Sequence, residues 1–278
     1  MFKIVSDSSS DLLVLNDVAF ATVPLKISTS EKEFIDNDLL DVAEMLNYLE
    51  SYRGKSGSAC PGVGEWLEAF ADAEFVFCVT ITSGLSGSYN AASIAAREYM
   101  EAYPDRRVYV VDSLSTGAES VLLIERIKGM ILQGFSFDEI VSGIQQYSSH
   151  THLLFALESL HNLANNGRVN PLVAKLAGLI GIRVVGCASA KGTLEILEKV
   201  RGAAKTVDAL FAQMTANGYV GGRVRIHHCE NSTMAQALAN KITAQYPNAC
   251  IIISQTRALC SFYAERGGIL VGYEDGLQ

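Results

Sequence analysis

The feature that most constrains the fold is an apolar run that passes directly into a turn of small residues and then into a helix-forming segment. The run is Phe75–Val79, and the turn reads Thr80-Ile81-Thr82-Ser83-Gly84-Leu85-Ser86-Gly87-Ser88. A short, continuous apolar run followed by turn residues is typical of a strand buried on both faces of a parallel sheet. The turn is then expected to present backbone N–H groups and hydroxyls at a helix N-terminus, where an anionic or carbonyl head group can bind.

Strands and helices alternate through the first half of the chain, which predicts a mostly parallel α/β sheet flanked by helices. Pro24 indicates an edge or an irregularity in the second strand. The expected strands are Phe2–Ser6, Ala19–Ser28, Phe75–Ile81 and Val108–Val111. The expected helices are Asp38–Glu50, Gly64–Ala73, Ser86–Met100, Thr116–Gln133 and Phe137–Ser148.

After about residue 150 the pattern changes, because Ser189-Ala190-Lys191-Gly192 is a hairpin signal between two strand-like runs. Hairpins together with crossovers predict a second α/β domain with a mixed sheet. Its expected strands are Thr151–Ala156, Arg183–Ala188, Thr193–Ile196, Arg223–His228, Ala249–Ser254 and Ile269–Tyr273. Its expected helices are Leu157–Asn166, Pro171–Leu179, Arg201–Asn217 and Thr233–Tyr246. We therefore expect domains over residues 1–150 and 151–278, with a ligand between them.

Charge, apolar length and cysteine spacing exclude several classes of function. The net charge is -8 and no basic stripe occurs, which argues against a nucleic-acid partner. The apolar segment 172–185 is interrupted by Lys175 and Arg183, so no membrane span is expected. The six cysteines show no CxxC spacing, and no signal peptide is apparent at the start. The sequence thus predicts a cytoplasmic protein with free thiols and no zinc site.

Three polar segments allow either a functional or a structural interpretation. Asp7 and Ser8-Ser9-Ser10 end the first strand, where ligands often bind, but an Asx-turn and helix cap explains them equally well. Arg168 follows a turn, and its guanidinium suits a carboxylate or phosphoryl group unless it is simply solvated. The run 227–229 (His-His-Cys) is interpreted as ordinary strand residues, because neighbours in a strand face opposite sides and cannot easily ligate one metal ion.

Five segments carry a recognisable pattern in order: residues 3–12, Ser58-Ala59-Cys60-Pro61-Gly62, residues 81–89, Val110-Val111-Asp112-Ser113 and Asn166-Gly167-Arg168-Val169. Together these segments resemble the DegV family of bacterial fatty-acid-binding proteins. This resemblance implies two α/β domains that enclose a long-chain fatty acid in an apolar tunnel, with serine hydroxyls holding its carboxylate. It further implies no intrinsic enzyme activity and no cofactor, with presentation of the fatty acid to a separate fatty acid kinase.

The same resemblance assigns roles to individual residues. Arg168 matches the Gly-Arg position that supports the kinase reaction, and it would face the partner. Gln255 stands where the family usually has a histidine, and Ser58 and Cys60 replace the Thr and Gln of the family's proline loop. The ligand-binding positions carried over are Ser58, Ser83, Gly84, Ser86 and Gln255.

A serine-dependent acyl or ester hydrolase is the alternative, with Ser83 or Ser86 as the nucleophile. The turn lacks the Gly-x-Ser-x-Gly elbow that such enzymes use. His150, His152 and His161 are the available bases, although nothing in the sequence pairs them with a serine.

Overall fold

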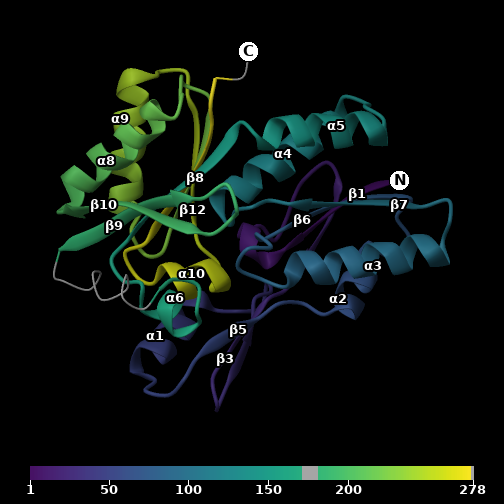
Figure 1. Ribbon diagram of the computed structural model, residues 1–278, viewed down its shortest axis with the longest axis horizontal. Helices are drawn as coiled ribbons and strands as arrows, with labels where there is room; N and C mark the ends of the chain where they lie inside the picture. The colour runs from purple at the N-terminus through teal and green to yellow at the C-terminus, as the bar shows by residue number, and fades with distance from the viewer. Residues whose placement is uncertain (171–180, 277–278) are drawn as a thin grey trace.

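The computed structural model describes residues 1–170 and 181–276, which form three β-sheets with helices packed around them (Figure 1). One sheet is parallel, one is mixed and one is a small antiparallel sheet. This arrangement confirms the predicted α/β fold class with a parallel and a mixed sheet. The helix expected at Pro171–Leu179 lies outside the described residues.

Sheet A is parallel, with strand order β2-β1-β6-β7, and helices cover both of its faces (Figure 1). Successive side chains of a strand point to opposite faces. Val76 and Cys78 therefore pack under α2 and α3, whereas Phe77 and Val79 pack under α4 and α5. Its strands are β1 (Phe2–Asp7), β2 (Ala19–Val23), β6 (Phe75–Thr80) and β7 (Arg107–Asp112). The helices are α2 (Val63–Phe70), α3 (Ser88–Ala102), α4 (Ala118–Leu132) and α5 (Phe137–Ser148), and a 3-10 turn, η1 (Ser8–Ser10), follows β1.

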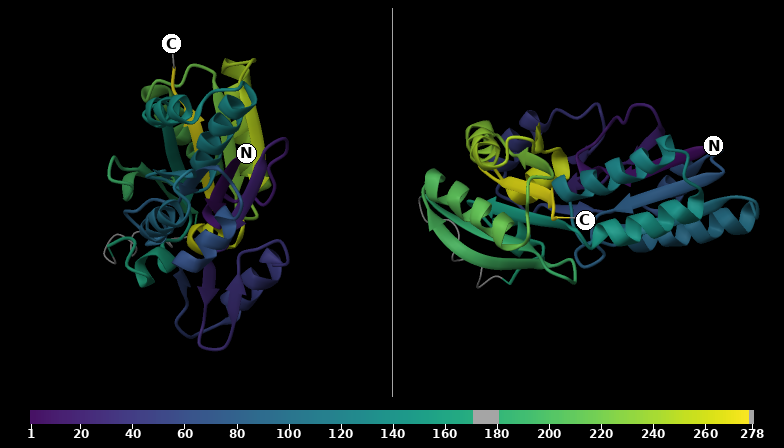
Figure 2. Two further views of the ribbon diagram at one scale, coloured as in Figure 1. Left: turned by 90° about the vertical axis from the view of Figure 1, so that its right-hand side faces the viewer. Right: turned by 90° about the horizontal axis from the view of Figure 1, so that it is seen from above.

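Sheet C is mixed, with strand order β10-β9-β8-β13-β11-β12. Helices α8 (Ala203–Ala216) and α9 (Ser232–Gln245) cover one face, and α10 (Ala258–Ala264) packs against the other. The two further views show this sheet beside sheet A (Figure 2). Its strands are β8 (Thr151–Leu157), β9 (Ile182–Ala188), β10 (Leu194–Arg201), β11 (Arg223–His228), β12 (Cys250–Gln255) and β13 (Ile269–Glu274).

Sheet B was not expected from the sequence. It contains β3 (Lys26–Ser28), β4 (Glu33–Ile35) and β5 (Gly57–Ala59), which are too short to show a periodic pattern. The prediction of one strand over Ala19–Ser28 is wrong, because the chain leaves sheet A at Pro24 and enters sheet B at Lys26. Proline has no N–H to donate to a strand ladder, and the next amide, that of Leu25, donates to Ser8 Oγ instead.

Several element boundaries also differ from the prediction. Helix α1 (Val42–Ser51) starts four residues later than the predicted start at Asp38, because the Asp41 carboxylate accepts the Glu44 N–H and caps it. Leu39 therefore precedes the helix and is 86% exposed rather than on its buried face. Helix α6 (His161–Asn165) is shorter than predicted, since β8 extends to Leu157. Helix α10 was not predicted at all.

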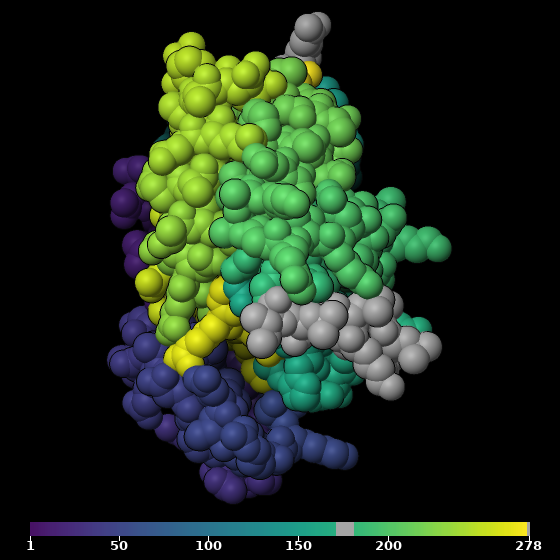
Figure 3. Space-filling model, turned by 90° about the vertical axis from the view of Figure 1, so that its left-hand side faces the viewer, coloured from purple at the N-terminus to yellow at the C-terminus, as the bar shows by residue number. Residues whose placement is uncertain are grey.

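Segments from the two ends of the chain share one core. Ile27 and Met45 pack with Ala258 and Phe262, so β3 and α1 lie against α10. Figure 3 shows the yellow C-terminal region between the purple-to-blue segment below it and the green helices above it. Helix α4 contacts strands of both sheet A and sheet C. Division of the chain at residue 150 separates these two sheets, and the two-domain boundary itself stays a prediction.

Candidate functional site

A cavity of about 310 Å³ lies where the three sheets and α10 meet. This volume is at the lower end of the range for small-molecule sites. Most of its lining is apolar, and the polar lining side chains are Ser58, Ser86, Thr116, Arg168 and Tyr263. The aliphatic and aromatic lining residues are Leu25, Ile81, Leu85, Leu153, Phe155, Leu157, Leu163, Leu194, Leu259 and Leu270.

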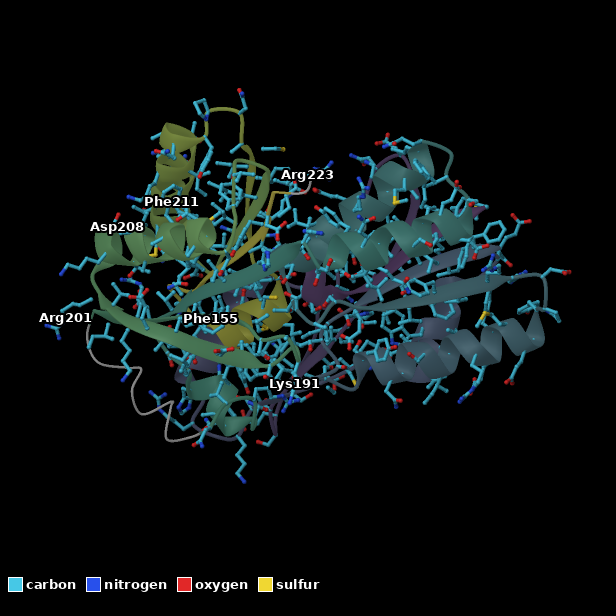
Figure 4. All side chains as sticks on the ribbon, turned by 45° about the horizontal axis from the view of Figure 1, so that its top comes forward. Phe155, Lys191, Arg201, Asp208, Phe211 and Arg223 are labelled. Atoms are coloured by element: carbon cyan, nitrogen blue, oxygen red, sulfur yellow. The ribbon has the colours of Figure 1, made fainter. Side chains whose placement is uncertain are left out.

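Two simple periodicities produce the apolar wall. In β8, alternate residues face the cavity, namely Leu153, Phe155 and Leu157, each no more than 3% exposed. In α10, Leu259 and Tyr263 lie one turn apart on the same face. Gly186 of β9 leaves room for the Phe155 ring, because a Cβ at that position would lie 2.3 Å from Phe155 Cζ. Figure 4 shows Phe155 lying close to α10.

Three loops distant in sequence converge at the polar end of the cavity. The Asn166 side-chain amide donates to Ser56 O at 3.3 Å, which joins the loop around Arg168 to the loop that carries Ser58. Arg168 Nε donates to Leu85 O at 3.3 Å, which joins it to the turn that carries Ser86. The residues at these junctions are half-buried, and the neighbouring lining residues Cys60 and Gly87 are exposed, so the polar end lies at the protein surface.

Ser58 and Arg168 are both available to a ligand carboxylate. The Ser58 and Tyr263 hydroxyls lie 2.7 Å apart, and a hydroxyl of such a pair can still donate or accept a further hydrogen bond. Arg168 donates to the carbonyl oxygens of Leu85 and Asn166. Both of these acceptors are neutral, so these two contacts do not neutralise the guanidinium charge. The arrangement therefore suits one anionic group at the end of an apolar chain.

The expectation that the turn presents free N–H groups is wrong for most of its amides. Thr82 O accepts from Leu85 N and Ser86 N, and Ser83 N donates to Asp112 Oδ1 at 3.0 Å. Gly84 N donates to Thr82 Oγ1 at 3.0 Å. These amides therefore already have partners within the protein, and the polar contribution of the turn's side chains to the cavity comes from the Ser86 hydroxyl.

The sequence-predicted ligand residues separate into two groups in space. Ser58 and Ser86 line the cavity, and Arg168 joins them there. Ser83, Gly84 and Gln255 are exposed and are absent from the lining of the described cavity. Gln255 ends β12, the edge strand of sheet C.

Asp7 and the serines after it serve the fold. Asp7 is fully buried, and its carboxylate accepts from Ser9 Oγ at 2.5 Å, Ser88 Oγ at 2.5 Å and Ile81 N at 3.0 Å. Burial raises the pKa of Asp7, and these three donors oppose that shift. The carboxylate ties the end of β1 to the end of β6 and the start of α3, which favours the structural interpretation of this segment.

The imidazoles in the described part of the chain bond to partners other than Ser83 or Ser86. His150 Nδ1 and His152 Nε2 lie 2.8 and 3.0 Å from the two Asp275 oxygens. His227 Nδ1 lies 2.8 Å from Asp11 Oδ2 in a buried pair. The remaining imidazoles bond to Asn165 and to the amide of Asn231. These contacts give neither turn serine a general base.

Helix α10 is held in place by a buried carboxylate. Asp36 is fully buried and accepts from Ala258 N at 3.2 Å and Leu259 N at 3.1 Å, at the start of the helix. Burial raises the pKa of Asp36 to about 6, against the lowering effect of the Leu259 and Ala258 amides. The helix that presents Leu259 and Tyr263 to the cavity therefore depends on a titrating group.

This pKa predicts a specific pH dependence of stability. Because the folded-state pKa of Asp36 exceeds its unfolded value, its contribution is fully present below about pH 4 and is lost as pH rises through about 6. As pH rises from about 4 to above about 6, the unfolding free energy of the wild type is expected to fall by about 2 to 3 kcal/mol relative to that of Asp36→Asn. Urea denaturation across the range measures this difference. Asp38→Asn, at an exposed position nearby, is the control. A difference in unfolding free energy between wild type and Asp36→Asn that stays constant with pH would contradict the prediction.

The structure is therefore an α/β protein with a mostly apolar cavity that ends in hydroxyls and a guanidinium. Such a cavity is suited to an elongated amphiphile. The family model described as "Uncharacterised protein, DegV family" matches residues 1–274. A "DegV domain-containing protein" of Streptococcus gordonii is 44% identical over 279 residues, covering 99% of each chain. The chain therefore belongs to the DegV family, and the resemblance seen in its motifs is confirmed.

Two solved structures are similar over almost the whole chain. A DegV family protein from Eubacterium eligens, loaded with heptadecanoic acid, is 43% identical with a TM-score of 0.98 and covers 99% of this chain and 100% of its own. The Streptococcus pneumoniae Fatty Acid Kinase (Fak) B3 protein, loaded with linoleic acid, is 42% identical with a TM-score of 0.97 and covers 99% of each chain. No helix among residues 1–170 and 181–276 is long and apolar enough to cross a membrane.

Sequence reasoning missed several residues that complete the site. Tyr263, Thr116 and Cys260 line the cavity, and none was singled out. The i, i+4 spacing of Leu259 and Tyr263 is a signal that could have revealed α10 and its cavity face. The contact between the Ser58 and Tyr263 hydroxyls, by contrast, joins residues 205 positions apart and leaves no local signal.

Proposed function

We propose that this chain binds one long-chain fatty acid, with the acyl chain in the apolar cavity and the carboxylate at its polar end. The supporting observation is the convergence of Ser58, Ser86 and Arg168 at the surface end of a mostly apolar cavity. A relative 43% identical to this chain is loaded with heptadecanoic acid. Each methylene moved from water into such a cavity contributes about 0.8 kcal/mol, so a long chain gains on the order of ten kcal/mol before the costs of ordering.

Mass spectrometry of the purified protein tests this proposal. Gentle conditions are expected to show one fatty acid per chain, and denaturing conditions are expected to release it. The delipidated protein is expected to rebind a long-chain fatty acid at a 1:1 ratio. Protein that carries no lipid and binds none on titration would contradict the proposal.

The carboxylate is proposed to bind to Ser58 and Ser86. Replacing both serines with alanine is expected to weaken fatty acid binding at least tenfold, because hydrogen bonds to a charged group contribute about 1.5 to 3 kcal/mol each. Binding is measured by titration of a fluorescent fatty acid. Ser83→Ala is the matched control, because Ser83 belongs to the same turn but lies outside the cavity lining. Equal affinity in the double variant would place the carboxylate elsewhere.

We further propose that the bound fatty acid is presented to a separate fatty acid kinase, with Arg168 supporting phosphoryl transfer. The polar end of the cavity is at the surface, where a partner can reach the carboxylate. A planar guanidinium is well suited to the charge that develops on a transferring phosphoryl group. Burial of the acyl chain makes release into water slow, which favours presentation of the carboxylate to a docked partner while the acyl chain stays bound.

Arg168→Ala is expected to retain its fatty acid but to lower the phosphorylation rate at least tenfold. The reason is that the acyl chain supplies most of the binding free energy, whereas the guanidinium acts on the head group. The assay combines purified fatty acid kinase, ATP and the lipid-loaded variant, with lipid content measured in parallel. Arg168→Lys is the control that keeps the charge but removes the planar fork. Loss of lipid from Arg168→Ala would instead identify the guanidinium as the carboxylate anchor.

The hydrolase alternative receives no support from the geometry. A serine nucleophile needs an adjacent base, and the described imidazoles bond to other partners. Turnover of a p-nitrophenyl ester that disappears in Ser86→Ala would revive this alternative.

A further inference from the structure

The hairpin between β9 and β10 rests directly on the turn that leads into α3. Thr82 Oγ1 donates to Gly192 O at 2.9 Å and accepts from Gly84 N at 3.0 Å. A single hydroxyl therefore bonds to both segments at once. Thr82 is only 2% exposed, so water does not readily replace these bonds. Figure 4 shows Lys191 at the end of the hairpin nearest to α3.

Two glycines allow this close approach. A Cβ at Gly84 would lie 2.6 Å from Lys191 O, and a Cβ at Gly192 would lie 1.9 Å from Thr82 Oγ1. Gly192 also has a φ of 69°, which few other residues adopt without strain. The hairpin therefore lies close against the backbone of the turn, and a side chain at either glycine would push the hairpin away.

Both segments continue into the cavity lining. Leu85 and Ser86 belong to the turn and line the cavity, and their amides are held by Thr82 O at 3.3 and 3.2 Å. Leu194 lines the cavity two residues after Gly192. Any separation of the hairpin from the turn therefore moves two walls of the cavity apart.

The hairpin tip is held together by hydrogen bonds of its own. Ser189 N donates to Thr193 O at 2.8 Å, and the hydroxyls of the same two residues lie 2.8 Å apart. A register shift between Ile196 and Glu198 interrupts the pairing of β10 with β9, and such a bulge bends a strand. The tip is thus internally rigid and lies beyond a bend in an edge strand.

We propose that Thr82 is a positioning residue that latches the hairpin tip, residues 189–193, against the turn beside the cavity and sets the rate of fatty acid exchange. This inference rests on the proposed fatty acid binding. It gives Gly84 and Thr82 a role in closing the site, in place of direct contact with the ligand. The latch acts through Gly192 and Gly84, and the ligand carboxylate remains at Ser58 and Ser86.

Stopped-flow transfer of a fluorescent fatty acid from the loaded protein to excess phosphatidylcholine vesicles tests the latch. Thr82→Val keeps the branched shape but removes the hydroxyl, and it is expected to release the probe about fivefold faster than wild type. Thr82→Ser keeps the hydroxyl and is expected to release it within twofold of wild type. Equal rates for Thr82→Val and wild type, or equally fast release by Thr82→Ser, would overturn the proposal.

A second variant keeps the test decisive if Thr82→Val folds poorly. Gly84 is exposed and its φ is not positive, so alanine can adopt its backbone conformation. Gly84→Ala is expected to speed release at least fivefold, because the added Cβ displaces Lys191 O. Gly64→Ala, where a Cβ meets nothing within 4 Å, is the matched control. A lower melting temperature in Gly84→Ala with an unchanged release rate would show a purely structural contact and overturn the latch. Failure of wild type to bind the probe would instead contradict the proposed function.

Discussion

Replacing Ala264 with phenylalanine is expected to empty the cavity of fatty acid. Ala264 ends α10, is 3% exposed and lines the cavity. A phenyl ring there would occupy space needed by the acyl chain, because a cavity of about 310 Å³ has little room to spare. We expect at least a tenfold fall in the fatty acid that copurifies with the protein, measured by mass spectrometry after denaturation.

Ala209→Phe is the control for this experiment. Ala209 is partly buried in α8 and packs against the opposite face of sheet C, away from the cavity. Overpacking at either position destabilises the fold by about 1 to 3 kcal/mol. Only the Ala264 variant is expected to lose lipid while its circular dichroism stays native. A full complement of fatty acid in folded Ala264→Phe would show that the chain lies elsewhere.

Replacing Asp7 with alanine is expected to lower the unfolding free energy by about 3 to 5 kcal/mol. The change leaves the hydroxyls of Ser9 and Ser88 and the amide of Ile81 without their buried acceptor. Each unsatisfied buried donor costs about 1 to 3 kcal/mol, although local rearrangement recovers part of the sum. Urea denaturation measures the loss.

Asp7→Asn is the conservative comparison. The amide retains an acceptor oxygen at similar volume, so we expect less than half of the alanine variant's loss. Because the carboxylate joins β1, β6 and α3, the alanine variant is also expected to loosen the turn that carries Ser86. A loss below about 1 kcal/mol in Asp7→Ala would mean that the three donors find other partners.

Much of the fold is encoded in local patterns. The continuous apolar run Phe75–Val79 predicts a strand that is buried on both faces. Helices pack against both faces of β6, as this pattern requires. The hairpin signal at residues 189–192 is likewise local, and it joins β9 to β10. Sheet B was missed because its three-residue strands are shorter than the roughly four to eight residues over which an alternating pattern can be recognised.

The candidate site was only partly predictable. Ser58 and Ser86 were identified through the family resemblance, and both line the cavity. Ser83 belongs to the same motif, yet it is exposed and its amide is bonded to Asp112. Side chains in a tight turn point in different directions, so a shared motif does not place them in a shared pocket.

The sequence by itself determined the α/β class, the family and the polar turn at the end of β6. These are recorded in local periodicity and in short motifs, which involve residues close along the chain. Only the tertiary structure decided that Ser58 meets Tyr263, that Arg168 reaches the Leu85 carbonyl, and that Gly84 supports the hairpin. These contacts join segments 83 to 205 residues apart. Their geometry depends on how three sheets pack, which no local periodicity records.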